Sequence, residues 1–349
     1  MIKKLLSCIW CQTLGLVLAG LLQTATAADL PLGQPHLSPF SANAYMKEMR
    51  SGGPSKDGIP SIDAPKLWTA TQADTYLDAQ DIVFGVYANG EARAYPQRVL
   101  VWHELVNDEI GGKALSISYC PLTATAIGFE RGTTELGVSG NLINSNMVMY
   151  DRASDSYWPQ ILGIGISGPH RGDSLSEYPV VWTTWQNWKQ RHPDTSVLST
   201  STGFIRNYRS DPYGGYNPPS GYYEIGYPLM FPVMKRAGRE FAEKQMVLGF
   251  RTAELAVAVD LEHLRRQKVL HYEHKGSHFL IIHDPGLDAG WVFQSPEAVT
   301  IDPDEVAFTA EGPQSEDLES ATPVNSFQAL WFAWAAFYPD TVVLNAAKR

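Results

Sequence analysis

The chain has 349 residues, of which 44% are hydrophobic and 18% are charged, and its formal net charge is −10. This composition predicts a globular protein stabilised by packing, because ten tryptophans and many aliphatic side chains are available to fill cores. The acidic balance disfavours nucleic acid and anionic membrane surfaces as partners, since both repel negative charge.

The first 27 residues are typical of a signal peptide. Lys3 and Lys4 form a short positive end, residues 14–22 form an apolar run, and Ala25-Thr26-Ala27 has the small-x-small pattern of a cleavage site. We therefore expect export and signal-peptide removal near Ala27, which makes the protein periplasmic or secreted.

Removal of this segment leaves about 322 residues with a net charge of −12. Cys8 and Cys11 fall inside the segment, so Cys120 is the one cysteine left and no internal disulfide is expected. No later run reaches the roughly 18 apolar residues that a membrane span requires. We expect a soluble protein without a membrane span.

Two tryptophan-containing segments repeat one another. Residues 185–198 read WQNWKQRHPDTSVL and residues 331–344 read WFAWAAFYPDTVVL, with seven identical positions 146 residues apart. A weaker echo links the segment that begins at Asp81 to the one that begins at Gln245, 164 residues later. Such self-similarity predicts a duplicated unit, of which the second copy is the shorter.

The predicted fold class is α+β and predominantly β, with two duplicated units that each end in a short tryptophan-containing helix. We place the first repeat at 69–202 and the second at 245–349. Hairpin signals such as Asn89-Gly90 between alternating apolar runs support strands in both. Residues 203–244 are rich in Gly, Pro and Tyr and predict an aromatic connector, and residues 28–68 predict an irregular leader.

Several blocks occur in a fixed order from about Asp57 to the end: GEARAYP, WHELVND, YCPLTATA, GVSGNLINSNMVMYDR, and the HPDT and FAWAAFYPDT endings. In this arrangement the chain resembles a family of exported prokaryotic proteins catalogued as domain of unknown function three-one-seven-nine. The resemblance implies kinship of fold and no established reaction. In that family the central block is commonly Y-C-P-L-C-G-S, and some relatives are described as selenoproteins. Here Cys120 matches the first thiol position and Thr123 stands at the second.

Thr123 excludes the dithiol–disulfide cycle of a C-x-x-C pair, so chemistry at this block has to use one sulfur. Cys120 could form a mixed disulfide, a sulfenic acid or a metal–thiolate bond, or it could be an inert packing residue. His103 and Glu104, expected beside a short helix or turn, are its candidate neighbours; the alternative for His103 is a hydrogen-bonded packing role. The catalytic candidates are therefore Cys120, His103, Thr123 and Glu104.

Five further residues are candidates for substrate binding: Arg93, Tyr95, Asn107, Asn144 and Tyr150. Arg93 and Tyr95 are two apart on an expected strand and share a face, where Arg93 either binds an anion or pairs with a core carboxylate. Asn107 and Asp108 predict a turn, with a supporting role at the site as the alternative.

Two groups of residues could bind a metal. Met147 and Met149 share a strand face, and together with Cys120 and His103 they would form a soft ligand set suited to Cu(I); core packing is the alternative. In the second repeat, residues 271–283 contain four histidines around a KGS turn, which could converge on a metal or remain solvated. These histidines are His271, His274, His278 and His283.

The sequence lacks the signatures of nucleotide-binding loops, HExxH proteases and GxSxG hydrolases. Three hypotheses follow. The first is a single-thiol redox or thiol-exchange protein centred on Cys120, with a small thiol or a protein thiol as its partner. The second is a binding module for copper or a small ligand, and the third is a cysteine-dependent hydrolase or a scaffold that has lost catalysis. The first is favoured because the position of the thiol is better supported than any ligand set.

Overall fold

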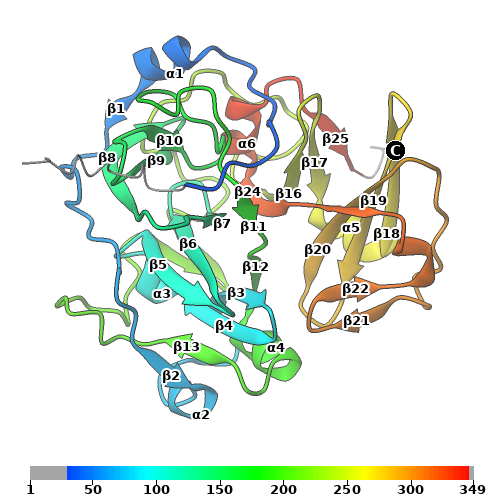
Figure 1. The fold of residues 1–349 in the computed structure, drawn as a ribbon, viewed down its shortest axis with the longest axis horizontal. Coiled ribbons are helices and arrows are strands. Elements are labelled where there is room, and N and C mark those ends of the chain that lie inside the picture. The colour runs from blue at the N-terminus through cyan, green and yellow to red at the C-terminus, as the bar shows by residue number, and fades with distance from the viewer. Residues whose placement is uncertain (1–29, 346–349) are drawn as a thin grey trace, which may run out of the picture.

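The computed structural model describes residues 30–345, and the signal peptide predicted at 1–27 lies outside the described residues. Strands dominate within that range and the helices are short (Figure 1). The predicted α+β, predominantly β fold class is confirmed.

Two sheets of the first repeat have counterparts in the second repeat. In the first repeat their strands are β2 (Leu67–Thr69), β3 (Ile82–Ala88), β4 (Glu91–Pro96), β5 (Leu105–Ile110), β6 (Lys113–Cys120), β7 (Thr125–Glu130), β11 (Glu177–Tyr178), β12 (Val181–Thr184) and β13 (Ser196–Leu198). One sheet has the order β12-β3-β4-β13-β2 and the other has the order β11-β7-β6-β5. The Asn89-Gly90 turn joins β3 to β4 with positive φ at both residues, as the sequence predicts.

The second repeat has the same strand order. Its strands are β16 (Met246–Arg251), β17 (Ala256–Asp260), β18 (Val269–His274), β19 (Ser277–Asp284), β20 (Ala289–Ser295), β23 (Thr322–Val324), β24 (Ser326–Leu330) and β25 (Val342–Leu344). They form sheets of order β24-β16-β17-β25 and β18-β19-β20-β23. The parallel pair β4·β13 has its counterpart in the parallel pair β17·β25, so the duplication extends to strand direction.

The two tryptophan-containing helices, α4 (Trp185–Arg191) and α6 (Trp331–Phe337), pack on equivalent glycines. A Cβ atom on Gly85 would lie 2.2 Å from the Trp188 ring, and one on Gly249 would lie 2.2 Å from the Trp334 ring. Each indole N–H donates a 2.9 Å hydrogen bond to the threonine of the following Pro-Asp-Thr segment. The residues shared by the two segments therefore build one repeated helix–sheet contact.

The remaining helices are α1 (Ala42–Glu48), α2 (Ala70–Ala73), α3 (Gln97–Leu100) and α5 (Leu261–Gln267), with one 3₁₀ turn at Glu316–Leu318. The expectation that the leader is irregular throughout is wrong for α1. Ser41 caps this helix by accepting a hydrogen bond from the Ala44 amide, and Tyr45 anchors it in the core. Seven residues are too few for helical periodicity to stand out in the sequence.

An additional sheet distinguishes the first repeat. Strands β1 (Arg50–Ser51), β8 (Leu136–Ile143), β9 (Asn146–Asp151) and β10 (Tyr157–Pro159) form it in the order β1-β8-β9-β10. The second repeat has only the hairpin β21 (Ala307–Thr309) and β22 (Gly312–Gln314) in the corresponding part of the chain. This difference explains why the second copy is the shorter one.

The connector runs from the first repeat to the second and contains one small hairpin, β14 (Gly214–Tyr216) with β15 (Pro219–Gly221). Tyr222 and Tyr223 are buried, whereas Ile205 is 97% exposed. The buried tyrosines belong to the same core cluster as Cys120 and the inward face of α6. The connector therefore packs over the end of β6, where Cys120 lies.

Candidate functional site

Cys120 ends strand β6, and the following proline begins the loop to β7. Its side chain is buried, with 1% of the residue exposed. The sulfur accepts the Met147 N–H at 3.3 Å and lies 3.8 Å from the carbonyl oxygen of Ser145. Burial, followed by the charge of Glu104, raises the pKa of Cys120 to about 12, while hydrogen bonds from Thr123 and Met147 act in the opposite direction. Cys120 is thus a neutral thiol at physiological pH.

Thr123, at the second thiol position of the family block, lies beside the sulfur in a buried polar network. Its hydroxyl is 2.8 Å from that of Thr125 and accepts a 3.0 Å hydrogen bond from Asn146. The Thr125 hydroxyl donates its proton to Gln160 at 2.6 Å. The Thr123 hydroxyl can therefore donate its own proton to Thr125 or to the Cys120 sulfur. The network holds the loop in place and supplies a hydroxyl donor where a second thiol is absent.

Glu104 is a buried carboxyl group in the turn between α3 and β5. The residue is 8% exposed, and among residues 30–345 its carboxyl group has no hydrogen-bond or ion-pair partner, although its oxygens are not fully shielded from solvent. Burial raises its pKa to about 8, and its charge raises the pKa of both Cys120 and Tyr213. Its φ of +59° adds backbone strain, because a side chain disfavours this region. A buried acid without a partner at a strained position is typical of a functional group.

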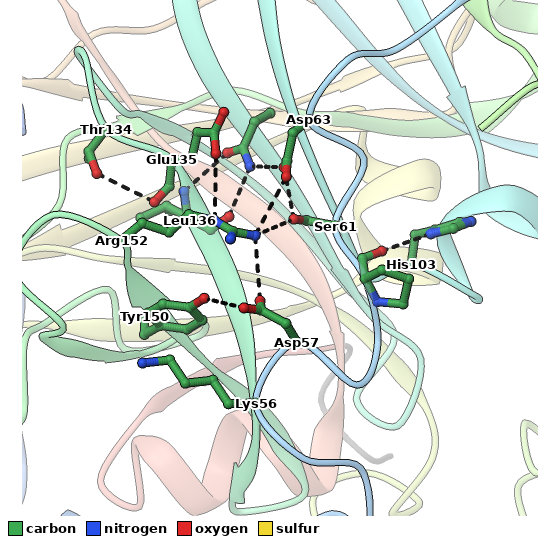
Figure 2. Close-up of polar contacts among 12 residues, drawn as sticks. Lys56, Asp57, Ser61, Asp63, His103, Thr134, Glu135, Leu136, Tyr150 and Arg152 are labelled. Atoms are coloured by element: carbon green, nitrogen blue, oxygen red, sulfur yellow. Dashed lines mark hydrogen bonds and ion pairs between the residues drawn. The ribbon is translucent and has the colours of Figure 1, made fainter. Parts of the chain in front are cut away.

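His103, predicted as the neighbour of Cys120, makes other contacts. Its Nδ1 lies 2.8 Å from the carbonyl oxygen of Pro60, and its Nε2 lies 2.6 Å from the hydroxyl of Tyr208 in the connector. Within the described part of the chain no hydrogen bond joins His103 to Cys120. His103 therefore links the leader to the connector, as Figure 2 shows on the leader side.

The connector is attached over the Cys120 loop by polar contacts. Tyr222 donates a 2.9 Å hydrogen bond to the Leu122 carbonyl, and the Asn144 side chain accepts one of 2.7 Å from the Met234 amide. Burial, followed by the charge of Cys120, raises the pKa of Tyr222. Asn144, predicted as a substrate ligand, instead anchors the connector.

Arg93 and Tyr95 meet one carboxylate. Arg93 lies 2.7 Å from Asp108, and the Tyr95 hydroxyl donates to the same side chain at 2.7 Å. Arg93 and Tyr95 thus lie on one face of their strand, as predicted, and the partner of Arg93 is a core carboxylate. The predicted turn at Asn107 and Asp108 is wrong: both lie in β5, and the turn falls at Gly111, because the Asn107 side chain is held by hydrogen bonds within the sheets.

Tyr150 lies in a polar network between β9 and the leader (Figure 2). Its hydroxyl donates a 2.5 Å hydrogen bond to Asp57, and Lys56 lies 3.9 Å from its ring centroid. Arg152 adds a 3.0 Å hydrogen bond to Ser61. These contacts fasten the leader to the additional sheet.

The proposed metal ligands are distributed as follows. Met147 and Met149 are buried in the core cluster that also contains Cys120, whereas both ring nitrogens of His103 already have partners. The four histidines of 271–283 flank the expected hairpin turn. Residues 30–345 contain no group of three or more His, Cys, Asp or Glu side chains arranged to hold a metal ion. The copper site remains a prediction.

Asp284 occupies in the second repeat the place of Cys120 in the first. Cys120 ends β6 opposite Thr125, and Asp284 ends β19 opposite Ala289, each with a proline after it. Asp284 is fully buried and pairs with Arg191 of α4 at 3.0 Å. Cys120 and Asp284 are 164 residues apart, which equals the offset between the starts of the two repeats, so the sequence holds a signal for this equivalence. The second repeat fills the position with a paired structural carboxylate.

A protein-family model described as "Protein of unknown function (DUF3179)" matches residues 56–341. The chain belongs to this family. No curated protein and no solved structure matches the chain. The family match covers the first repeat, the connector and the second repeat as far as residue 341, so the Cys120 loop, Glu104 and the covering tyrosines all lie within the family region. Among the described residues, no helix has the length and apolar character needed to cross a bilayer.

Proposed function

We propose that the protein carries a covered single-thiol redox centre, in which Cys120 exchanges with a small disulfide and Glu104 accepts its proton. The observation that supports this proposal is a buried carboxyl group, without a hydrogen-bond or ion-pair partner among the described residues, whose charge raises the pKa of the buried Cys120 thiol. A structural carboxylate at such depth normally has a cation or several N–H donors beside it, as Asp284 does.

The proposed reaction begins with proton transfer from the Cys120 thiol to the Glu104 carboxylate. The thiolate then attacks one sulfur of the disulfide; its S–S bond breaks, a bond to Cys120 forms, and the released thiolate takes a proton from Glu104. Because Cys120 is the one cysteine among residues 30–345, a second, external thiol has to attack the mixed disulfide and regenerate the free thiol. The Met147 amide and Thr123 stabilise negative charge on sulfur during both exchanges.

Access to the sulfur requires movement of the connector. Its inner tyrosines are buried against the Cys120 loop, while Ile205 and Ile225 on its outer side are largely exposed. Opening has to break the hydrogen bonds that hold the connector on the body, such as those from Tyr222 to the Leu122 carbonyl and from Trp102 to the Ser210 carbonyl. Opening would hydrate both Cys120 and Glu104 and lower the pKa of the thiol, because burial is the main cause of its rise.

The proposal is tested by incubating the mature protein with 2-hydroxyethyl disulfide at pH 8 and following the intact mass. We expect one adduct on the wild type, removed by dithiothreitol, and none on Cys120→Ser. Tyr222→Ala should accelerate addition by about tenfold or more by weakening the cover. Ile205→Ala, at a connector residue that is 97% exposed, is the matched control and should leave the rate unchanged.

Two results would contradict the proposal. One is a wild-type thiol that forms no adduct when folded but reacts fully in urea. The other is an adduct whose rate responds equally to Tyr222→Ala and Ile205→Ala, since the cover at Tyr222 would then not control access to Cys120.

A further inference from the structure

A cavity lies between the two repeats, and neither the connector nor the Cys120 loop lines it. Its volume is about 470 Å³, within the usual range for small-molecule sites. Two segments form much of its wall, residues 177–182 of β11–β12 and residues 323–328 of β23–β24. Figure 1 shows β11 and β12 between the two halves, next to β20 and β24.

The two wall segments are equivalent positions of the duplicated unit. Tyr178 pairs with Gly128 as Val324 pairs with Val292, and both pairs occupy the same place in their sheets. The cavity is therefore lined by equivalent strand segments of both repeats. Duplication brings the same strand junction to the cavity twice, once from each repeat.

The side chains in this wall are not symmetric. Glu177 stands where the second repeat has Pro323, and Asn325 stands where the first repeat has Pro179. Most of the remaining wall is apolar and includes Trp182, Leu248 and Phe327. The cavity wall is thus mostly apolar, with a few polar side chains that include Glu177 and Asn325.

Both carboxylates of the cavity wall have a cationic partner: Glu130 pairs with Lys113 at 3.1 Å, and Glu177 pairs with Arg251. Glu177 forms an ion pair with the fully buried Arg251 and accepts a 2.8 Å hydrogen bond from Asn325. His36 lies 3.7 Å from the same carboxylate, and burial, followed by the charge of Arg251, lowers its pKa to about 4, so that it is neutral at pH 7. An ionised ligand would have no opposite charge to pair with here.

Buried polar atoms without hydrogen-bond partners gather around this cavity. The part of the chain that the structure describes has seven such side-chain atoms, and four belong to residues of the cavity wall or its ion pair. They are His36 Nε2, Arg251 Nε, Trp291 Nε1 and Asn325 Oδ1. Unpaired buried donors and acceptors are costly and rare, so their concentration at one place indicates a missing partner.

We propose that this inter-repeat cavity binds a neutral, mostly apolar small molecule that carries one hydrogen-bonding group, such as a hydroxyl or secondary amine. The apolar body lies against Trp182 and Phe327. Its polar group reaches Asn325 or His36 after a small side-chain rotation that exposes the unpaired atom. The site is independent of the thiol chemistry proposed for Cys120.

The test uses N-phenyl-1-naphthylamine, a neutral aromatic probe with one N–H donor, whose fluorescence rises in apolar surroundings. The wild-type protein should bind it saturably at one site. Ser326→Trp, which fills the cavity from its wall, should weaken binding by at least about tenfold, and Asn325→Leu should weaken it through loss of the acceptor. Thermal unfolding of each variant confirms that the fold is retained.

The exposed apolar side chains of the connector are the main competing site for the probe, so Ile225→Ser is the matched control. We expect this variant to bind as the wild type does. The proposal is overturned if the wild type shows no saturable binding, if Ser326→Trp binds normally, or if Ile225→Ser abolishes the signal. Cys120→Ser should bind the probe unchanged, which separates this test from that of the thiol centre.

Discussion

Replacing Glu104 by glutamine should change how stability depends on pH. Burial raises the pKa of Glu104 from an ordinary value of 4.5 to about 8, so at pH 7 folding requires this carboxyl group to take up a proton. Because the folded-state pKa is the higher one, the contribution of Glu104 to stability is complete below pH 4.5. It is lost as pH rises from 4.5 towards 8. Between pH 4 and pH 7 the loss amounts to about 3 kcal/mol.

The Glu104→Gln variant has no such titration. The difference in the free energy of unfolding between variant and wild type should therefore grow by about 3 kcal/mol from pH 4 to pH 7 in favour of the variant. Any constant contribution of the buried amide cancels in this comparison. The measurement is urea unfolding followed by tryptophan fluorescence at several pH values.

The matched control is Glu109→Gln, an exposed acid on the same strand, β5. Its difference from the wild type should stay within about 0.5 kcal/mol across the pH range. Parallel stability curves for Glu104→Gln and the wild type would refute the claim that Glu104 is held protonated by burial. A growing difference would mean that the protein keeps this acid at a cost to its stability.

Three further predictions concern the scaffold. Gly85→Ala and Gly249→Ala should each lower the free energy of unfolding by about 1–3 kcal/mol in urea titrations, because each new methyl meets a tryptophan ring; a large effect at one site only would contradict equivalent packing. Asp284→Asn should lower the free energy of unfolding by about 3–5 kcal/mol, because Arg191 would lose its carboxylate partner. A loss below about 1 kcal/mol would show that the pair is not buried in solution. Tyr208→Phe removes the hydroxyl bonded to the leader–connector histidine and should hasten limited proteolysis within residues 203–244, with unchanged cleavage as the contrary result.

The sequence predicts those parts of the fold that depend on local patterns. The shared tryptophans and Pro-Asp-Thr segments indicate the duplication, and Asn89-Gly90 predicts the first hairpin. These signals suffice because residue spacing along one element determines them. The helix α1 is missed because it is short and gains its stability from the burial of Tyr45 rather than from its own pattern.

The site is less predictable because its chemistry depends on tertiary burial. Sequence proximity suggests Cys120, Thr123, His103 and Glu104 as one group, but His103 bonds instead with Tyr208 of the connector, 105 positions away. The rise in the pKa of Cys120 and Glu104 comes from the strands and the connector that surround them, which no local motif encodes.

The central claim, that Glu104 accepts the proton of Cys120, is tested most directly by the rate of mixed-disulfide formation with 2-hydroxyethyl disulfide as a function of pH. In the wild type the rate should rise through pH 8 as Glu104 ionises, and Glu104→Gln should lose this step and react about 100-fold more slowly at pH 8. If the carboxylate acted only through its charge, its removal would lower the pKa of Cys120 and speed the reaction. A faster Glu104→Gln variant, or an unchanged pH profile, would contradict the account.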